Sequence, residues 1–353
     1  MNGYSMAVRL GVLDIGSNSA QLQIVEATVG APPLPLHAIK TATRLAESIG
    51  TDQHLEEAGI DRVCRAVTQI LDDAHRYEVD QIYLFVTAAI RDALNRDAVL
   101  DRIAAECGLR PQYLTGLQEA RLTYLAVHRW YGWCAGRLLD IDIGGGSMEI
   151  ALGRDATPEL AVSLPLGAGR LTRGFFEVDP PTGKQIKELR RHVRATLRET
   201  ADRLRWERKP QLVVATSKTF KQLARLAGAP PQRKGPFVRR TLARRDVHAW
   251  VPRLAEMTAQ RRAALRGISR PRAAQILAGA IVAEETMLAL DVDEVDVSPW
   301  ALREGVMLQH LSAVNAPENN LPLQPLTPQL PDTGATISAL PSAPLARTPS
   351  PRR

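Results

Sequence analysis

Two short stretches of the chain place a carboxylate just before a glycine-containing turn between two apolar runs. The first is LDIGSNSAQLQIV, from residue 13, and the second is IDIGGGSMEIALG, from residue 141. Asp14 aligns with Asp142 and Ser19 with Ser147, at a constant offset of 128 residues. One glycine turn between strands is usually only a turn, so it is the matched pair that indicates an internal duplication with a shared task.

The residue types in these turns suit the binding of phosphate and of a metal ion. Glycine reaches backbone angles that aim successive N–H groups into one concavity, where phosphate oxygens bind, and serine adds hydroxyl donors. A lone strand-end aspartate usually caps a turn, but a matched pair suits Mg²⁺ held partly through water. We therefore expect metal contacts from Asp14 and Asp142, and phosphate contacts from Gly16, Ser17, Asn18, Ser19, Gly144, Gly145, Gly146 and Ser147.

The elements around the turns are predicted to be strands alternating with helices. In the first part, strands are expected at 8–14, 22–27, 81–87 and 111–115, and helices at 60–74, 91–108 and 117–129. Thr51 and Asp52 are the candidate caps of the first helix. In the second part, strands are expected at 159–164 and 211–215, helices at 183–206, 247–266 and 272–290, and a strand, proline turn and helix over 294–311. This alternation indicates an α/β fold, and the duplication predicts two similar lobes whose turns face each other across a cleft.

Composition excludes several classes of protein. The 353 residues are 45% hydrophobic and 24% charged, which is ordinary for a globular protein with room for two domains. Aromatic residues make up only 5%, which argues against a stacking platform for single-stranded nucleic acid. The three cysteines have no CxxC spacing, and neither a signal peptide nor a transmembrane run is recognisable. We expect a reduced, cytoplasmic protein with no membrane partner.

Positive charge is concentrated in one part of the chain. Residues 184–272 contain 25 Lys and Arg against 6 Asp and Glu, a surplus of 19. Because the whole chain carries +7, the remainder is 12 units negative. For any single arginine in it, a solvated helix surface is the better explanation, but the asymmetry as a whole favours a cationic region that attracts a polyanion.

Seven motifs, taken in order, resemble one family. They are LDIGSNS, TAAIRDALN, TGLQEARLTYLAV, LDIDIGGGSMEI, SLPLGAGRLT, VVATSKTF and SPWALREGVML. On these motifs, from about residue 9 to 311, the chain resembles the exopolyphosphatase/guanosine pentaphosphate phosphatase family (Ppx/GppA), and most closely its short bacterial exopolyphosphatase form. The resemblance implies an α/β fold of two ribonuclease H-like lobes, as in actin, sugar kinases and heat-shock ATPases, with a cleft between the domains.

The resemblance also suggests a division of the chain. A first actin-like lobe is expected over 1–130, joined by a returning C-terminal helix at 300–312, and a second lobe with the basic helical region over 131–299. Nine prolines fall within 313–353, and this composition predicts a disordered tail.

Further site residues follow from the resemblance alone. It implies that Glu119, in GLQEARL, is the catalytic base, whereas the residues by themselves would suggest a first-turn carboxylate stabilised by the helix dipole. Thr87 and Arg91 are implied to hold the substrate phosphate, the arginine with a bidentate grip. Glu149 is implied to bind Mg²⁺ or to orient water.

Two positions depart from the family pattern. Gln118 stands where relatives often have an acidic residue, before the expected base. Lys218 stands where many have glycine, in the segment that forms the base pocket of nucleotide-binding relatives. A lysine there would crowd a purine or bind a phosphate of a polymer, which favours polyphosphate over guanosine pentaphosphate (pppGpp).

These observations predict a hydrolase that uses Mg²⁺, or another divalent cation such as Mn²⁺, to release orthophosphate from the end of inorganic polyphosphate. The nearest alternatives are hydrolysis of pppGpp and nucleotide pyrophosphatase activity, with a kinase less favoured. A different alternative is a non-catalytic binder of polyanions or nucleic acid, but no helix-turn-helix, zinc or RNA-recognition signature is visible. We thus expect no specific nucleic-acid partner. A homodimer is compatible with the resemblance but has no marker in the sequence.

Overall fold

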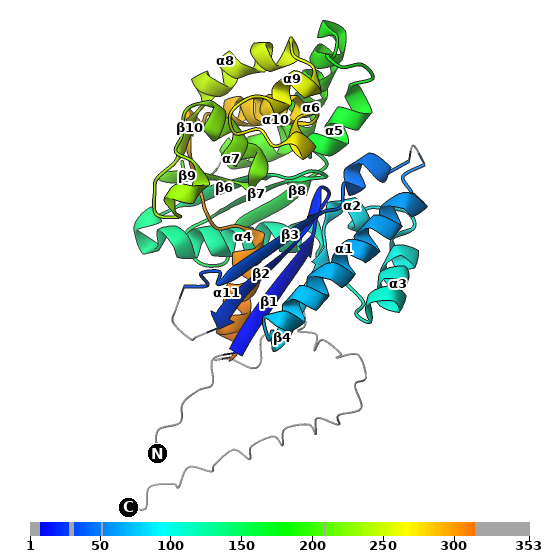
Figure 1. The fold of residues 1–353 in the computed structure, drawn as a ribbon. Coiled ribbons are helices and arrows are strands. Elements are labelled where there is room, and N and C mark those ends of the chain that lie inside the picture. The colour runs from blue at the N-terminus through cyan, green and yellow to red at the C-terminus, as the bar shows by residue number, and fades with distance from the viewer. Residues whose placement is uncertain (1–7, 28–31, 51, 206, 208, 315–353) are drawn as a thin grey trace, which may run out of the picture.

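The computed structural model describes residues 8–27, 32–50, 52–205, 207 and 209–314. These residues form two α/β lobes, one above the other in Figure 1, with one sheet in each lobe. The expected arrangement of two similar lobes is therefore confirmed.

The first lobe is built on a five-stranded sheet in the order β3-β2-β1-β4-β5. Its strands are β1 (Val8–Ile15), β2 (Ser19–Ala27), β3 (His37–Ala42), β4 (Gln81–Val86) and β5 (Gln112–Tyr113). The first three are antiparallel, and β4 and β5 continue parallel to β1. The helical elements are η1 (Leu45–Ser48), α1 (Glu57–Arg76), α2 (Ala88–Arg91), α3 (Arg96–Cys107) and α4 (Gly116–Tyr131).

The second lobe repeats this topology and adds one edge strand. Its sheet has the order β10-β11-β9-β6-β7-β8. The strands are β6 (Leu138–Ile143), β7 (Met148–Gly153), β8 (Leu160–Leu164), β9 (Leu212–Thr216), β10 (Thr241–Ala243) and β11 (Glu294–Val297). Its helices are η2 (Trp133–Ala135), α5 (Ala168–Phe175), α6 (Gly183–Arg205), α7 (Ser217–Leu226), η3 (Gln232–Lys234), α8 (Arg244–Ala255), α9 (Ala259–Ala263), η4 (Arg270–Arg272) and α10 (Ile276–Ala289).

The internal duplication extends to the pairing register of the strands. In the first lobe Asp14 pairs with Gln21, and in the second Asp142 pairs with Glu149, again 128 residues later. In each sheet, two antiparallel strands follow the first strand and two parallel strands lie on its other side. This is the ribonuclease H-like arrangement that the fold class requires.

Side-chain alternation along the first strand of each lobe decides where the two aspartates lie. Leu13 and Ile15 face the core under α1 and α3, so Asp14 lies on the opposite face with Leu10 and Val12. That face packs against α4 and α11 (Leu302–Val314).

The same alternation places Asp142 on the face of the second sheet that packs against α4. Leu138 lies on that face with Tyr124 of α4. Ile141 and Ile143, with the other parity, belong to the core on the far side of the sheet. One helix is thereby packed against the aspartate-bearing faces of both sheets.

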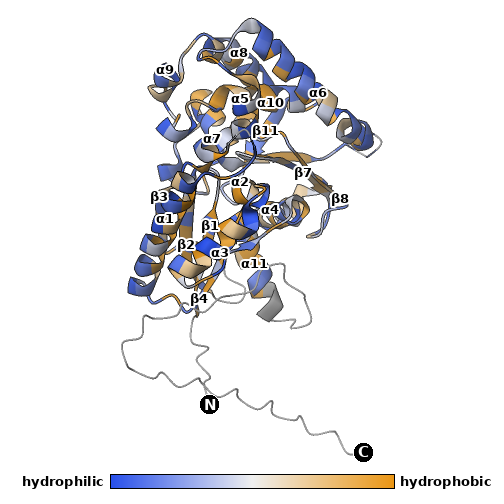
Figure 2. Cartoon of the chain, turned by 90° about the vertical axis from the view of Figure 1, so that its right-hand side faces the viewer, coloured by the Kyte–Doolittle hydropathy of each residue, from blue (hydrophilic) through white to orange (hydrophobic). Residues whose placement is uncertain are grey.

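The helices follow the patterns in their sequences. On α1 the buried residues recur with helical periodicity, which matches the stripe expected at 60–74. In α10, by contrast, all residues from Ile276 to Met287 are buried, because α6, α8, α5 and the sheet surround it. Figure 2 shows the difference, with apolar residues in the central elements and hydrophilic residues along the outer helix α6.

Some expected boundaries were wrong. The helix α1 is capped at Glu56 and not at Asp52, while Thr51 lies outside the described residues. The single helix expected at 91–108 is divided into α2 and α3, because the side chain of Asn95 bonds the backbone of Leu55 through both its oxygen and its nitrogen. The helix expected at 247–266 is also divided, since Thr258 caps a separate helix, α9. The strands β3 and β10 were not expected.

The expected domain boundary near residue 130 stays a prediction, because α4 contacts elements of both lobes. The last helix does pack on α4 and β1, as a returning helix at 300–312 would. This helix continues to Val314 and so includes the first two residues of the tail expected at 313–353. The rest of that expected tail, residues 315–353, lies outside the described part of the chain. No described helix combines the length and the apolar character needed to cross a membrane.

Candidate active site between the two lobes

A cavity of about 190 Å³ lies between the lobes, and nearly all of the expected site residues line it. Those residues are Asp14, Gly16, Ser17, Asn18, Ser19, Thr87, Glu119, Asp142, Gly144, Gly145, Gly146, Ser147, Glu149 and Lys218. They come from the ends of β1, β4, β6 and β9 and from the segments that follow. Within each sheet the two strands are parallel, β1 with β4 and β6 with β9, so their carboxyl ends lie at the same edge of that sheet, where α/β sheets bind ligands.

The two turns have the same internal hydrogen bond. The N–H of Gly16 donates to the carbonyl of Ser19 at 3.1 Å, and the N–H of Gly144 donates to that of Ser147 at 2.9 Å. We call residues 16–19 and 144–147 the first and second phosphate loops.

A following segment fixes the carbonyls of each phosphate loop. In the second loop, the carbonyl of Gly144 accepts from the N–H of Ala168, and that of Gly145 accepts from the N–H groups of Gly169 and Arg170. The carbonyl of Gly146 accepts from Nε of Arg170 at 2.8 Å. In the first loop, residues 43–46 hold the carbonyls of residues 16–18 in the same way.

This arrangement orients the loop N–H groups. In a trans peptide the N–H points away from the preceding carbonyl, so three consecutive N–H groups in each loop face away from the holding segments. The holding segments do not line the cavity, whereas both loops do. The N–H groups of Ser17 to Ser19 and of Gly145 to Ser147 therefore face the cavity, which is the geometry that binds phosphate oxygens.

Gly145 and Gly146 are needed for space and not for unusual backbone angles, which corrects the sequence-based reason for them. None of the loop glycines has positive φ. A Cβ on Gly145 would lie 2.8 Å from Oγ of Ser17, and one on Gly146 would lie 2.6 Å from Cβ of Ala88. The lobes thus touch each other at the phosphate loops.

The expected base lies at the start of α4. Thr115 and Gln118 form a capping box, in which Thr115 Oγ1 accepts from the N–H of Gln118 and the Gln118 side chain accepts from the N–H of Thr115. Gln118, where relatives often have an acid, therefore has a structural task. The cap fixes the first turn, which holds Glu119 at 8% exposure in the cavity.

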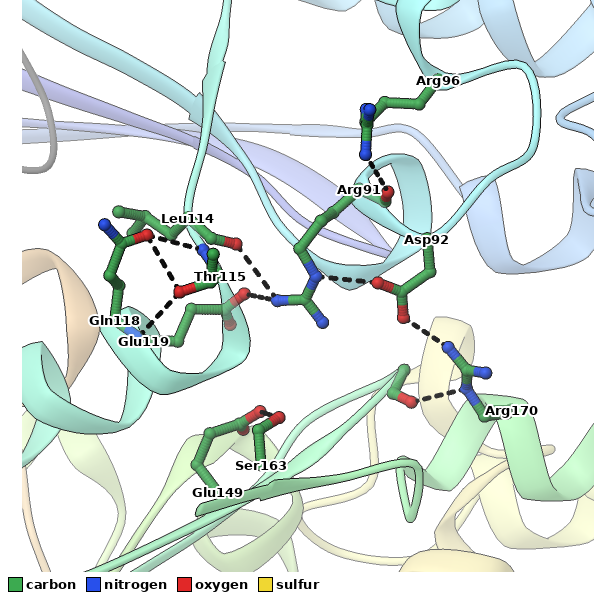
Figure 3. A network of polar contacts seen from close by, with 11 residues as sticks. Arg91, Asp92, Arg96, Leu114, Thr115, Gln118, Glu119, Glu149, Ser163 and Arg170 are labelled. Atoms are coloured by element: carbon green, nitrogen blue, oxygen red, sulfur yellow. Dashed lines mark hydrogen bonds and ion pairs between the residues drawn. The ribbon is translucent and has the colours of Figure 1, made fainter. Parts of the chain in front are cut away.

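Figure 3 shows the polar network around Glu119. Nη1 of Arg91 donates to the Glu119 carboxylate, and Nε donates to Asp92 at 2.8 Å. Asp92 also pairs with Arg170, which comes from the other lobe. Arg91 is not among the described residues that line the cavity, and its guanidinium contacts two carboxylates. Its bidentate grip on phosphate stays a prediction.

Glu149 lies across the cavity from this network and accepts from Oγ of Ser163 at 2.8 Å. Burial, and then the charge of Asp142, raises its pKa to about 7. Burial, and then the charge of Glu149, raises the pKa of Glu119 well above its ordinary value. We call the part of the cavity around Glu119 and Glu149 its acidic end.

The residues expected to bind metal fit an oxygen-coordinated cation held partly by other ligands. Burial raises the pKa of both Asp14 and Asp142. Oδ1 of Asp14 is buried with no hydrogen-bond partner, while Asp142 accepts from Thr216 at 2.6 Å. Among the described residues, no three His, Cys, Asp or Glu side chains are grouped to hold a metal alone. Hard carboxylate oxygens supplemented by water or phosphate suit Mg²⁺.

The other part of the cavity is cationic, and most of these residues were not found from the sequence. Lys218 lines it together with Lys40, Lys221, Arg272 and Arg303. Burial, and then the charge of Lys40, lowers the pKa of Lys218 to about 8. Burial lowers the pKa of Arg272 to about 10. We call these five residues the cationic end.

Two signals in the sequence could have identified further residues of the cavity. Lys221 follows Lys218 by three residues on α7, so both lie on one face of the helix. Gln21, which also lines the cavity, lies 128 residues before Glu149 and is its counterpart in the duplication. Lys40 and Arg272 come from distant elements and carry no local signal. Arg303 lies in the motif SPWALREGVML but was not singled out there.

Most of the basic residues at 184–272 lie elsewhere. Lys218, Lys221 and Arg272 line the cavity. Others form ion pairs away from it, including Arg190 and Arg194 with carboxylates of α10. Of this basic region, these three side chains are therefore the ones placed to meet a polyanion in the cavity.

The chain is similar in sequence to mycobacterial exopolyphosphatases. It is 45% identical to Exopolyphosphatase 1 of Mycobacterium bovis over 306 residues, 87% of this chain and 89% of the relative. It is 44% identical to Exopolyphosphatase 1 of Mycobacterium leprae over 306 residues, 87% of this chain and 90% of the relative.

Solved structures agree. A PPX-GPPA enzyme of Aquifex aeolicus superposes with a TM-score of 0.70 at 28% identity, covering 86% of this chain and 99% of its own. An exopolyphosphatase of Cytophaga hutchinsonii, at 24% identity, supports the fold, with a TM-score of 0.79 over 86% of this chain and 98% of its own. Residues 22–314 match the model of the Ppx/GppA phosphatase family, and the chain belongs to that family.

Proposed function

We propose that this protein is an exopolyphosphatase, which hydrolyses the terminal phosphoanhydride of inorganic polyphosphate and releases orthophosphate. The observation that carries the proposal is the division of the interlobe cavity into an acidic end with a buried carboxylate and a cationic end with five Lys and Arg side chains. The names of the mycobacterial relatives support the same substrate.

The terminal phosphate would bind at the acidic end, against the N–H groups of the two phosphate loops. Phosphoryl transfer requires mainly positioning and compensation of charge, which fixed N–H donors provide without reorganisation. Two buried donors that have no hydrogen-bond partner among the described residues, Nδ2 of Asn18 and Oγ of Ser217, are available to further phosphate oxygens. Ser217 adopts positive φ (74°) directly after β9, a strained conformation of the kind found at ligand sites.

Glu119 would act as the general base. Its raised pKa increases the affinity of the carboxylate for the proton that it must accept. Oxygen of the attacking water forms a bond to the terminal phosphorus while its proton passes to Glu119, and the bridging P–O bond breaks. Arg91, which donates to Glu119, orients the carboxylate.

The departing chain keeps the electrons of the broken bond, so negative charge develops on its new terminal phosphate. The five Lys and Arg side chains of the cationic end line the same cavity and would stabilise that charge. In the described part of the chain, no aromatic ring lines the cavity, which gives a purine nothing to stack on and favours a phosphate chain over pppGpp.

A divalent cation, Mg²⁺ or Mn²⁺, would be held by Asp14 and Asp142, with Glu149 binding it through water. Such an ion supplies charge neutralisation to the bound phosphates. Because the three cysteines are free, we assign the reaction to the reducing cytoplasm.

One assay tests the function. Orthophosphate release is measured from short polyphosphate, long polyphosphate and pppGpp, with Mg²⁺ and with a chelator. We expect release from polyphosphate that requires the metal, and weaker release from pppGpp. A preference for pppGpp would overturn the substrate assignment, and retention of polyanions with no release from any substrate would indicate a non-catalytic binder.

Glu119→Gln tests the mechanism. The amide has the same shape but cannot accept the proton, so kcat should fall by about 10²–10⁴-fold while polyphosphate still binds. Glu57→Gln, a change of the same type in the first turn of α1, is the matched control and should keep full activity. Near-normal turnover of Glu119→Gln would refute its role as the base.

A further inference from the structure

A second cavity, of about 420 Å³, lies behind the phosphate loops and is not used by the reaction described above. It shares four lining residues with the catalytic cavity: Ser17, Ala88, Gly145 and Gly146. The same four residues make the close contacts between the lobes. They therefore form a thin partition between the two cavities that contains no side chain larger than serine.

The chemistry of the second cavity suits a small anion. Arg170 and Arg173 line it, together with a single described carboxylate, that of Asp92. Arg170 uses Nε on the Gly146 carbonyl and Nη2 on Asp92. Within the described part of the chain, the guanidinium of Arg173 makes one hydrogen bond, a long one of 3.3 Å from Nη1 to the carbonyl of Gly169. The remaining guanidinium N–H groups can donate to a phosphate.

The position of the cavity relative to the substrate gives the anion an identity. In the proposed reaction, cleavage at the chain end produces orthophosphate beside Glu119 and Glu149, and the remaining polymer stays bound to the five cations of the cationic end. Glu119 and Glu149 then repel the released anion. The partition lies next to it, since Ala88 directly follows Thr87 and precedes the Arg91–Asp92 pair.

We propose that this second cavity binds the product orthophosphate through Arg173 and Arg170, and that the product leaves through it while the shortened polymer stays bound. The inference rests on the proposed exopolyphosphatase function. Separation of Gly145 from Ser17 and of Gly146 from Ala88 opens the partition, and the Asp92–Arg170 ion pair across the lobes closes it again.

Product inhibition tests the proposal on the full-length protein. Initial rates are measured at several concentrations of polyphosphate with added inorganic phosphate. Because phosphate and polymer occupy different cavities, phosphate should inhibit noncompetitively with respect to polyphosphate. Purely competitive inhibition would mean that phosphate uses only the catalytic cavity, and it would overturn the proposal.

Two variants separate the cavities. Arg173→Gln removes an anion contact and should raise the inhibition constant of phosphate about tenfold, with KM for polyphosphate unchanged. Lys218→Gln should instead raise KM for polyphosphate and have little effect on the inhibition constant of phosphate. Arg76→Gln, at an exposed position on α1, is the matched control. An unchanged phosphate constant in Arg173→Gln would refute the site.

The outcome also distinguishes this inference from the function on which it rests. Wild-type protein that releases no phosphate from polyphosphate would refute the function itself. Active protein whose inhibition is competitive refutes only the second site.

Discussion

The buried carboxylates at the acidic end set the pH range in which the enzyme works. Burial and the charge of Glu149 raise the pKa of Glu119, and burial and the charge of Asp142 raise that of Glu149 to about 7. A base must be deprotonated, so kcat/KM should fall as the pH drops through about 7, with an apparent pKa that belongs to the pair. The profile is measured from about pH 5 to about pH 9 at constant ionic strength.

Glu149→Gln should move this acid limb. Removing the neighbouring charge takes away the second-largest cause of the raised Glu119 pKa, so the limb should shift to lower pH even if the maximal rate falls. Glu57→Gln should leave the limb in place. If the acid limb of kcat/KM lies at the same pH in Glu149→Gln as in the wild type, the two carboxylates are not coupled.

Close contact at the phosphate loops makes Gly146 sensitive to substitution. In Gly146→Ala the new Cβ would lie 2.6 Å from Cβ of Ala88, so the lobes must separate at the loops. A displacement of about 1 Å at an active site costs about 10²-fold in catalytic rate, and we expect a loss of that order in kcat. Gly183→Ala, where a Cβ meets nothing within 4 Å, is the control for the substitution itself. Equal activity of the two variants would contradict the packing argument.

At the level of elements, α6 and α10 are joined by ion pairs in addition to apolar packing. Arg190 of α6 pairs with Glu284 and Glu285, which are 6% and 1% exposed. Arg194 adds a second contact to Glu285, and His248 of α8 contacts Glu284. Buried carboxylates need such partners because an unpaired charge in the interior is costly.

Arg190→Ala should therefore destabilise the second lobe. Removal of one partner from a buried pair costs about 3 kcal/mol in the free energy of unfolding. Denaturant unfolding measures the loss. Arg205→Ala, in an exposed pair on the same helix, should change stability by less than about 0.5 kcal/mol. A loss in Arg190→Ala no larger than that in Arg205→Ala would contradict the explanation.

For the whole molecule, the charge distribution across the lobes governs binding of the polymer. Lys40 belongs to the first lobe, Lys218 to the second, and Arg303 to the returning helix, so the cationic end exists only when the lobes are together. KM for polyphosphate should therefore rise steeply with salt. It should also rise above about pH 8, where Lys218, whose pKa is lowered to about 8, loses its charge.

Lys218→Gln should reduce both dependences. Loss of one phosphate contact lowers the slope of log KM against log salt by about one, and the increase above pH 8 should largely disappear. Lys209→Gln, at a side chain that is 85% exposed, is the matched control. A variant that keeps the wild-type slope would show that Lys218 does not contact the polymer.

The sequence by itself determined the repeated core of this protein. The alternation of strands and helices, the two Asp-Ile-Gly turns and the constant offset between them can all be seen in the sequence. They were enough to predict two lobes, the phosphate loops and a cleft. The resemblance supplied Glu119, Thr87 and Arg91. These residues are recognisable because each belongs to a short motif whose spacing the backbone geometry fixes.

Only the tertiary structure decided how the site is assembled. The pairing of Arg91 with Glu119 and Asp92, the space that requires Gly145 and Gly146, and most of the cationic end depend on contacts between distant segments. Lys40 and Arg303, for example, are separated by 263 positions in the sequence. The physical reason is that helix α4 is packed between two sheets, so the site exists only where both lobes meet it, and no local pattern encodes that meeting.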